Sequence, residues 1–565
     1  MTSPTPPQTY VSSALGWLLA VPALLGTLIT LVLPTAQTIW LSFQSGGVLR
    51  ESTYVGLANY GELLGEAAFW RALGFTFSLT VIPLLVAVVV GPLLALALDR
   101  AGTWTRRAGR IVLSLAIVAF SPVAVAGAWL RGSIGQASGL VTLAEGLREP
   151  ATAPGTLRLI VAAATFGLVC ALAVIAFLPA LRGGTAGPAT LVVGVLVGLA
   201  VVAVGLQTFS IGLVLTRGGP QRATETLAGL QFDYAFRLAE FGPGASVAAL
   251  TGVILGVLGI VATVVAAATR LSITLTPRTP APHAPAPHAP APHAPVPGVQ
   301  APGTPFPDAP APDTRATAVG MTVVGVAALV LVTAVGIVLT WPWMDGVLAS
   351  PATPAGTVTT QVNTWAPAIA GAIVSVGVAY LAALGIGGLR PLGRASEWLL
   401  LLFAPWLFVG PGPLSVANWQ NVHNLGLIDT FPALIQPLLV SVPALLVLTL
   451  LCKGLAERAR PGDFFGGVLL PSLPMAGVLV GAVALLNAHD LLWPMLVVQK
   501  QDLFTTPLAQ ANQLTGFAVT SPDVAAATPL VVVAVALAAL VAAQLLYLDR
   551  LAIRTNGSQV RTSGA

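Results

Sequence analysis

Residues 189–215 read ATLVVGVLVGLAVVAVGLQTFSIGLVL, a run of 27 residues without a charged side chain. About 20 apolar residues in a helix cross the roughly 30 Å of hydrocarbon in a bilayer, where a helix satisfies its own backbone polar groups. The run therefore predicts a membrane-spanning helix. Because it is longer than one straight crossing requires, part of it is expected to be tilted or bent.

The composition extends this prediction to the whole chain. Of the 565 residues, 56% are hydrophobic and 8% are charged, whereas a soluble globular domain carries about 25% charged residues. We therefore predict an all-α polytopic membrane protein of about twelve transmembrane helices. The other runs lie near 14–43, 73–98, 110–130, 158–179, 244–270, 317–343, 365–389, 398–415, 433–452, 467–498 and 524–548.

A segment rich in proline, alanine and histidine, residues 276–316, divides these runs into two sets of six. Proline at this density favours extended polyproline II, so the segment is predicted to be a linker between a first half, 1–275, and a second half, 317–565. Six spans per half make both halves enter the membrane in the same direction, with any two-fold axis along the membrane normal. His283, His288 and His293 recur every five residues, which indicates either a metal-binding tract or a slipped repeat in a tether.

The distribution of lysine and arginine predicts the orientation in the plasma or inner membrane. With the N-terminus inside, 16 of the 25 Lys and Arg residues lie in cytoplasmic segments, as the excess of basic residues in cytoplasmic loops requires. Both termini and the linker are therefore expected in the cytoplasm. The start, MTSPTPPQTYVSSALG, lacks the basic region of a cleaved signal peptide, so the first run is expected to be a retained span.

Several classes of function are disfavoured. The only lysines, Lys453 and Lys500, lie outside any GxxxxGK[ST] loop, and no HExxH or paired Cys motif accompanies the five histidines. Cys170 and Cys452 fall in or beside different apolar runs and require no disulfide. The net charge of +5 reflects loop topology rather than nucleic-acid binding. We expect no catalytic residue, metal or cofactor in this chain.

Four motifs of the first half occur in the order found in one known family. They are WLLAVPALLGTLITLVLPTAQTIWLSFQ at 17–44 with YVGLANYGELL at 54–64, FWRALGFTFSLTV at 69–81, FSPVAVAGAWL at 120–130, and LQTFSIGLVLTRGGPQRATETL at 206–227. Together they resemble the larger permease subunit of maltose-type sugar ABC importers.

The second half resembles the smaller permease of the same systems. The matching stretches are HNLGLIDTFPALIQPLL at 423–439, HDLLWPMLV at 489–497 and TTPLA at 505–509. The resemblance implies a fused pair of permeases, served by an extracytoplasmic solute-binding protein and by a separate dimer of ATP-binding subunits in which ATP would be held. Membrane lipids would surround it. The expected function is passage of a sugar or similar uncharged polar solute.

The cytoplasmic loops depart from the family pattern. Family permeases carry a short coupling helix with a Glu-Ala-Ala…Gly pattern, but here the loops read LPALRGGTAGPAT at 178–190 and CKGLAERARPGDFFGGVLLPSLP at 452–474. We expect asymmetric docking of the ATPase, dominated by the second loop. The candidate coupling residues are Arg182, Lys453, Arg458, Arg460, Phe464 and Phe465, with the two phenylalanines as apolar anchors.

Polar groups within or beside apolar runs are the candidates for the solute path. They are Gln207, Gln436, Asn487, His489, Asp490 and Trp493. The alternatives are helix–helix hydrogen bonds for the three amides, solvation near the outer side for Asp490 and an interfacial position for Trp493. Two rival functions stay open. One is an ATP-independent or proton-coupled transporter with His489 and Asp490 as its relay, and the other is a non-transporting assembly or sensor protein.

Overall fold

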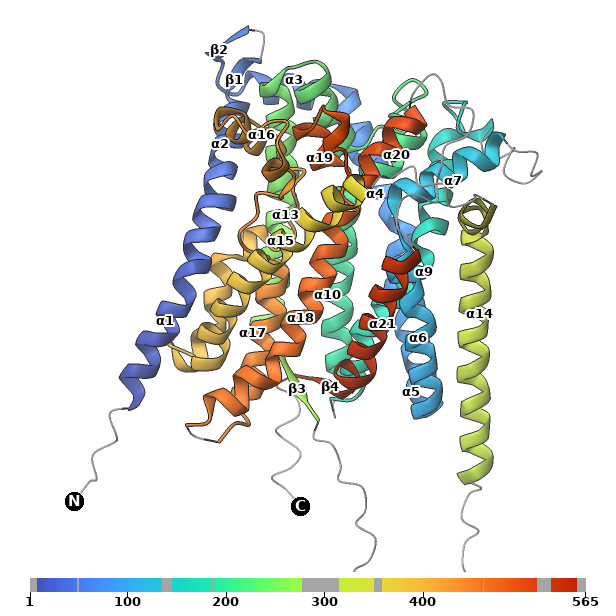
Figure 1. Ribbon diagram of the computed structural model, residues 1–565, viewed down its shortest axis with the longest axis vertical. Coiled ribbons are helices and arrows are strands. Elements are labelled where there is room, and N and C mark those ends of the chain that lie inside the picture. The colour runs from blue at the N-terminus through green and yellow to red at the C-terminus, as the bar shows by residue number, and fades with distance from the viewer. Residues whose placement is uncertain are drawn as a thin grey trace, which may run out of the picture.

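The computed structural model describes residues 8–47, 50–134, 145–183, 186–276, 314–349, 358–460, 462–515 and 530–555. Long helices run between two ends of the molecule (Figure 1), and the only strands in these ranges form two two-stranded sheets. Nine helices in the described ranges are long and apolar enough to cross a membrane. The predicted all-α polytopic membrane class is confirmed.

The first half begins with a helix that continues through a π turn, so that α1 and α2 together form one candidate span, Ser13–Ser42. A hairpin, β1–β2, and the short helix α3 follow it. The bounds are α1 Gln8–Thr27, α2 Leu33–Ser42, β1 Gln44–Gly47, β2 Arg50–Tyr54, α3 Ala58–Gly65, α4 Ala67–Leu85, α5 Gly91–Arg100, α6 Thr103–Ala119, α7 Pro122–Ile134, α9 Ala153–Leu181, α10 Ala186–Leu206, α11 Ser210–Leu215, α12 Leu227–Phe232, α13 Phe241–Ala268 and β3 Ser272–Leu275.

Within the described ranges, the second half contains fewer regular α-helices than the first. Its bounds are α14 Thr314–Ala349, α15 Val358–Ala383, α16 Ser415–Asn424, α17 Val442–Ala456, α18 Leu470–Ala488, α19 Leu492–Val497, α20 Thr506–Thr515, α21 Leu530–Leu546 and β4 Leu551–Arg554, with 3-10 turns at Gly393–Leu402 and Ala404–Trp406.

Several predicted spans differ from single long α-helices, including 189–215, which is divided between α10 and α11, and 467–498, which is divided between α18 and α19. The run 110–130 is divided between α6, which is followed by the extended residue Phe120, and α7, which begins at Pro122, where the fixed φ of proline suits the first position of a helix. The run 398–415 forms 3-10 turns instead of an α-helix. Pro405, Pro411 and Pro413 cannot donate backbone hydrogen bonds there. The run 433–452 becomes helical only from Val442.

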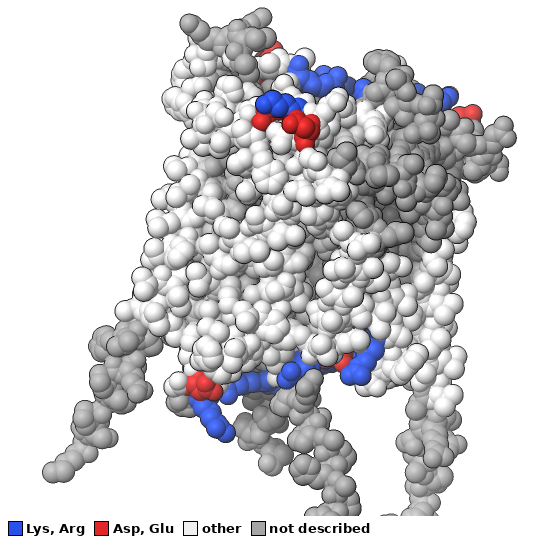
Figure 2. All heavy atoms as spheres, in the orientation of Figure 1, with Lys and Arg blue, Asp and Glu red and all other residues white. Residues whose placement is uncertain are grey.

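Charged side chains lie at the two ends of the molecule. Figure 2 shows Lys, Arg, Asp and Glu in an upper and a lower band, separated by a broad region of uncharged residues. Such a region is what a bilayer requires, since charges at membrane depth are costly. Following the orientation predicted from the sequence, we call the lower end, with β3 and β4 in Figure 1, the inner face, and the opposite end the outer face.

The two halves interlock across the bundle. α1 packs against α15 of the second half, while α14 packs against α5 of the first half. α13 likewise contacts the turn Ala404–Trp406, and α21 contacts α6. Close approach depends on small residues: a Cβ added to Gly259 would lie 2.2 Å from the carbonyl oxygen of Ala404. Small residues at helix contacts are typical of membrane proteins, where van der Waals packing drives association.

The two halves also meet in a small sheet at the inner face. β3 pairs antiparallel with β4, and Ile273 lies opposite Ile553. The residues around them repeat, reading TRLSI at 269–273 and DRLAI at 549–553. Each strand also abuts a helix end of the other half: a Cβ on Gly183 would lie 1.7 Å from the carbonyl oxygen of Ile553, and one on Gly454 would lie 2.1 Å from that of Ile273. A local two-fold relation therefore passes between these isoleucines.

Candidate functional site

A cavity of about 150 Å³ lies between the two halves. Gln207, Ser210, Gln231 and Thr251 of the first half contribute polar groups to its wall, and Asp490 does so from the second half. The rest of the wall is formed by Leu206, Phe209, Ala228, Pro411, Gly412, Pro413 and Leu492. Hydroxyl and amide groups dominate its polar surface, and Asp490 is the single ionisable residue among the lining residues.

Gln207 is placed by the end of α10. The helix stops at Leu206, and the Gln207 amide nitrogen donates to the carbonyl oxygens of Ala203 at 3.0 Å and Phe408 at 2.8 Å. Its oxygen accepts the backbone N–H of Gly410 at 2.7 Å. The predicted polar residue thus connects α10 to the irregular segment of the second half as well as lining the cavity.

Gln231, which the sequence patterns do not single out, makes a second connection between the halves. It is buried on α12, and its amide nitrogen donates to the carbonyl oxygen of Gly412 at 2.7 Å and to Ser415 Oγ at 2.9 Å. These bonds fix the turn 411–413 against the first half. The available signal was a glutamine in the otherwise apolar stretch LAGLQF.

Asp490 lies at the break between α18 and α19. Its carboxylate accepts the backbone N–H groups of Leu492 at 3.1 Å and Trp493 at 3.3 Å, which is the role of a carboxylate at a helix N-terminus. It also accepts the side-chain amide of Gln436 at 2.8 Å. These bonds hold Asp490 at the cavity wall, and it forms no ion pair within the described part of the chain.

The remaining predicted path residues surround Asp490, except for His489. Gln436, Asn487 and Trp493 line a narrow pocket beside the main cavity. Trp493 is 1% exposed, and its indole N–H donates to the carbonyl oxygen of Ala433 at 2.8 Å. His489 Nδ1 lies 2.8 Å from the carbonyl oxygen of Leu485, and its ring meets that of Trp365 edge-on, with centroids 6.3 Å apart.

A row of aromatic rings begins at the cavity wall. Phe209 lines the cavity and contacts Phe232, with ring centroids 5.4 Å apart. The row continues through Phe236 to Trp419, and Trp419 stacks on His423 with centroids 5.1 Å apart. The rings of both halves therefore form one continuous apolar contact next to the polar cavity.

The outer loop 216–226 connects α11 to α12, two helices of the first half. Glu225 is 6% exposed, and burial, followed by the charge of Asp233, raises the pKa of its carboxyl to about 7. In the second half, Asp429 is partly exposed and accepts the backbone N–H groups of Gln499 at 2.6 Å and Lys500 at 3.1 Å. The bond from Gln499 is the main cause of the lowered pKa of Asp429.

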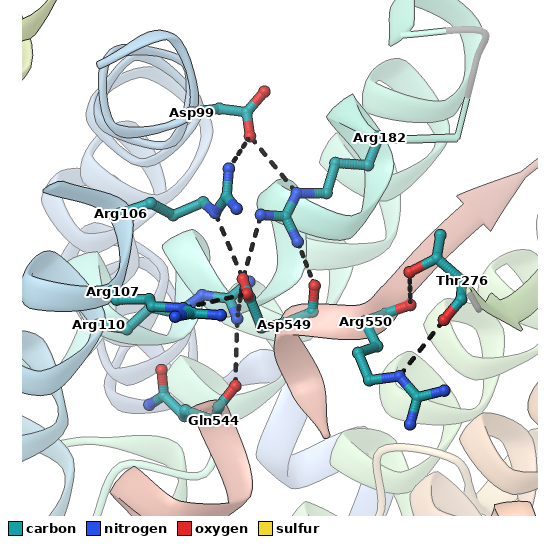
Figure 3. Close-up of polar contacts among 9 residues, drawn as sticks. All are labelled: Asp99, Arg106, Arg107, Arg110, Arg182, Thr276, Gln544, Asp549 and Arg550. Atoms are coloured by element: carbon teal, nitrogen blue, oxygen red, sulfur yellow. Dashed lines mark hydrogen bonds and ion pairs between the residues drawn. The ribbon is translucent and has the colours of Figure 1, made fainter. Parts of the chain in front are cut away.

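The predicted coupling residues lie at the inner face in different environments. Arg182 binds Asp99 at 3.4 Å and Asp549 at 3.1 Å (Figure 3). Lys453 is buried, pairs with Glu397 and donates to the carbonyl oxygen of Leu271 at 3.2 Å. Neither is a freely projecting group.

The other four coupling candidates follow α17. Arg458 donates to the carbonyl oxygen of Leu275 at 3.0 Å, and Arg460 is exposed. Phe464 packs inward, because a Cβ on Gly388 would lie 2.9 Å from its ring, whereas Phe465 is 63% exposed. Of the two proposed aromatic anchors, Phe465 is the one available to a partner.

Part of the chain is similar to permease proteins of sugar transport systems. It is 31% identical over 84 residues to the probable starch degradation products transport system permease protein AmyD of Thermoanaerobacterium thermosulfurigenes, a match covering 15% of this chain and 29% of that protein. It is 28% identical over 88 residues to the trehalose transport system permease protein SugA of Mycobacterium tuberculosis, covering 15% and 29%.

A third match is also partial. The trehalose/maltose transport system permease protein MalF of Thermococcus litoralis is 30% identical over 91 residues, covering 16% of this chain and 31% of that protein. The chain thus spans about three tenths of the length of the curated relatives it matches. No protein-family model matches the chain.

Proposed function

We propose that this chain forms the transmembrane pore of an ABC importer for a sugar or a similar uncharged polar solute. The observation that carries the proposal is the cavity between the halves, whose wall presents the amides of Gln207 and Gln231 and the hydroxyls of Ser210 and Thr251. Such groups hydrogen-bond to solute hydroxyls without demanding a charge. The similarity to permeases of trehalose and starch-product transport supports the same solute class.

The cavity also bears on the transport cycle. Its volume of about 150 Å³ is below the roughly 300–1,000 Å³ typical of ligand pockets. The described conformation therefore holds the halves close together, and admission of a disaccharide requires them to separate. Separation would break the bonds from Gln207 to Phe408 and Gly410 and from Gln231 to Gly412 and Ser415, which cross between the halves.

The partners follow from this proposal. An extracytoplasmic binding protein would deliver solute to the outer face, and a separate dimer of ATP-binding subunits would act at the inner face. ATP would be bound there and not in this chain. The fused halves, 1–275 and 317–565, would supply both permeases, and both termini and the linker would be cytoplasmic.

Uptake of labelled trehalose and maltose by cells expressing the full chain together with the genes that flank it tests the proposal. Ala228→Phe places a large ring in the cavity wall and is expected to abolish uptake while the protein still inserts. Leu238→Phe, at a side chain that is 55% exposed outside the cavity, is the matched control and is expected to transport normally. Equal uptake by both variants would contradict the cavity as the solute path.

A second candidate is an ATP-independent transporter, favoured by the short inner loops. α9 ends at Leu181 and α10 begins at Ala186, which leaves no room for a coupling helix between them. Vesicles depleted of ATP separate the two functions, because the importer loses uptake against a gradient and the facilitator still equilibrates the solute. If ATP-depleted vesicles still take up the solute, loss of that uptake in an Asp490→Asn variant would show that a proton relay requires this carboxyl.

A further inference from the structure

A second cavity, of about 480 Å³, opens at the inner face where the two halves meet. We call it the inner basic pocket. It is lined by Arg270, Ser272 and Thr274 of the first half and by Arg390, Arg394, Glu397, Lys453, Gly454, Glu457, Arg458, Arg554 and Thr555 of the second. Six of these residues are basic and two are acidic.

The two carboxylates are already engaged. Glu397 pairs with Lys453, and Glu457 pairs with Arg390 at 3.3 Å. The other four arginines form no ion pair with a carboxylate in the described part of the chain; they are Arg270, Arg394, Arg458 and Arg554. Four guanidinium groups around one cavity repel one another.

The pKa of Arg458 shows the effect of this repulsion. Partial burial, and next the positive charge of Arg554, lower its pKa. One of its N–H groups donates to the carbonyl oxygen of Leu275, which holds the side chain at the cavity wall. Within the described residues, the wall thus keeps four unpaired arginines close together, because its two carboxylates are paired with Lys453 and Arg390.

The first half has a basic cluster in which that charge is supplied. Asp549 binds Arg106, Arg110 and Arg182 at 3.1–3.3 Å and Arg107 at 3.6 Å. Figure 3 shows these side chains converging on one carboxylate, with Asp99 beside Arg106 and Arg182. The carboxylate comes from the second half and closes the cluster of the first.

The sequence repeat shows what the inner basic pocket lacks. When TRLSI at 269–273 is aligned with DRLAI at 549–553, Thr269 takes the place of Asp549. The alignment is also the structural one, since Ile273 and Ile553 face each other and contact Gly454 and Gly183 in turn. The second half donates a carboxylate to the first, whereas the Thr269 hydroxyl of the first half donates to the carbonyl oxygen of Val265 in its own helix at 2.7 Å.

We propose that the inner basic pocket binds an anionic phosphate group from the cytoplasmic side, in the role that Asp549 plays in the other half. Planar guanidinium groups bind phosphate oxygens with paired hydrogen bonds, and several of them favour a multiply charged phosphate. The cavity volume lies in the range of small-molecule sites. The phosphate belongs either to a soluble polyphosphate compound or to the headgroup of an anionic lipid.

Binding would act on the junction of the halves. Arg270 lies next to β3 and Arg554 belongs to β4, so one bound anion would neutralise charges from both strands of the inner sheet. The bound state would hold the inner ends of the halves together. This inference goes beyond the proposed transport function, because it concerns a ligand that is not the solute.

Titration calorimetry of the purified full chain with sodium tripolyphosphate, in detergent at constant ionic strength, tests the proposal. Wild type is expected to bind saturably. Arg394→Gln with Arg554→Gln is expected to weaken binding about 10-fold or more, since charge-assisted hydrogen bonds are lost. Arg71→Gln, an exposed outer-face arginine, is the matched control and is expected to bind as wild type does.

A gain of symmetry provides the second variant. Thr269→Asp supplies the missing carboxylate and is expected to weaken tripolyphosphate binding to a similar extent, while thermal unfolding shows that the protein stays folded. The same titration in nanodiscs distinguishes the two sources of the phosphate. If a lipid is the ligand, phosphatidic acid, but not phosphatidylcholine, competes with tripolyphosphate. If the ligand is soluble, neither lipid competes. Equal binding by all variants, or none by wild type, would overturn the site.

Discussion

The two halves use similar backbone contacts but different charges. On the outer side, Thr76 Oγ1 accepts the backbone N–H of Leu227 at 3.0 Å, and Thr364 Oγ1 accepts that of Thr506 at 2.8 Å. On the inner side, Gly183 and Gly454 each admit a strand of the other half. The charges differ, since the first half has its basic cluster filled by Asp549 and the second has an open basic pocket.

This difference shows which properties a repeated architecture must keep. Close backbone approach and buried N–H groups leave little freedom, because an added methyl group or a lost acceptor destabilises the fold. Charges at the aqueous ends are less constrained by packing, so they can differ between the halves. We therefore expect the separate roles of the two halves to depend on their different charges rather than on their similar backbones.

The largest expected effect comes from Asp549. Replacing it with Asn leaves four arginines, one of which is 2% exposed, without their shared carboxylate. Removing one member of a buried ionic cluster costs about 3–5 kcal/mol, so Asp549→Asn should lower the unfolding temperature strongly in detergent. Asp233→Asn is the control, because its partner Arg237 is 57% exposed and such pairs contribute little. Equal stability of the two variants would mean that the first cluster needs no anion.

The outer carboxyls should give the halves opposite responses to pH. The pKa of Glu225 is raised to about 7 from 4.5, so its ionised form destabilises the fold, and stability should fall as pH rises from about 4.5 to 7. The full effect is on the order of 3 kcal/mol. Glu225→Gln should remove this slope in unfolding measurements.

Asp429 behaves in the other direction. Its pKa is lowered by backbone hydrogen bonds, so its contribution is present above the unfolded pKa and is lost as pH falls through the folded one. Asp429→Asn should therefore matter only above the acidic range. For the first carboxyl, an unchanged pH slope in the Glu225→Gln variant would show that Glu225 is not the source of the fall in stability.

The glycines at the inner sheet should behave alike. Gly183→Ala and Gly454→Ala each place a Cβ about 2 Å from a strand carbonyl oxygen, which forces displacement of β4 or β3. Overpacking of this kind costs roughly 1–3 kcal/mol, measurable as a lower unfolding temperature. Gly155→Ala, with no atom within 4 Å of its added Cβ, is the control. A large loss for only one of the two would contradict the local two-fold relation.

The smallest effect is expected from the buried threonines. Thr76→Val and Thr364→Val each leave one buried loop N–H without its acceptor, at a cost of about 1–2 kcal/mol. Hydrogen exchange of Leu227 and Thr506 should rise in the matching variant and not in the other. Exchange that stays slow in both would show that these hydroxyls do not hold the outer loops.

The apolar runs and the scarcity of charge were sufficient to predict a helical membrane protein, because a bilayer permits few ways of satisfying a backbone. The cavity was predicted in part. Gln207 and Asp490 stand out as polar residues in apolar surroundings and do meet at one wall. Gln231 was missed, since its importance depends on the turn 411–413, which is distant in sequence.

The inner face was the least predictable region. Lys453, Phe464 and Arg182 are close to chain segments that suggest exposed loops, yet Lys453 is buried beside Glu397, Phe464 packs on Gly388 and Arg182 binds Asp549. Local composition shows which residues are charged or apolar, but the partner of each charge comes from the opposite half. Whether a basic cluster receives a carboxylate from the other half therefore depends on how β3 and β4 pair, which is a property of tertiary packing.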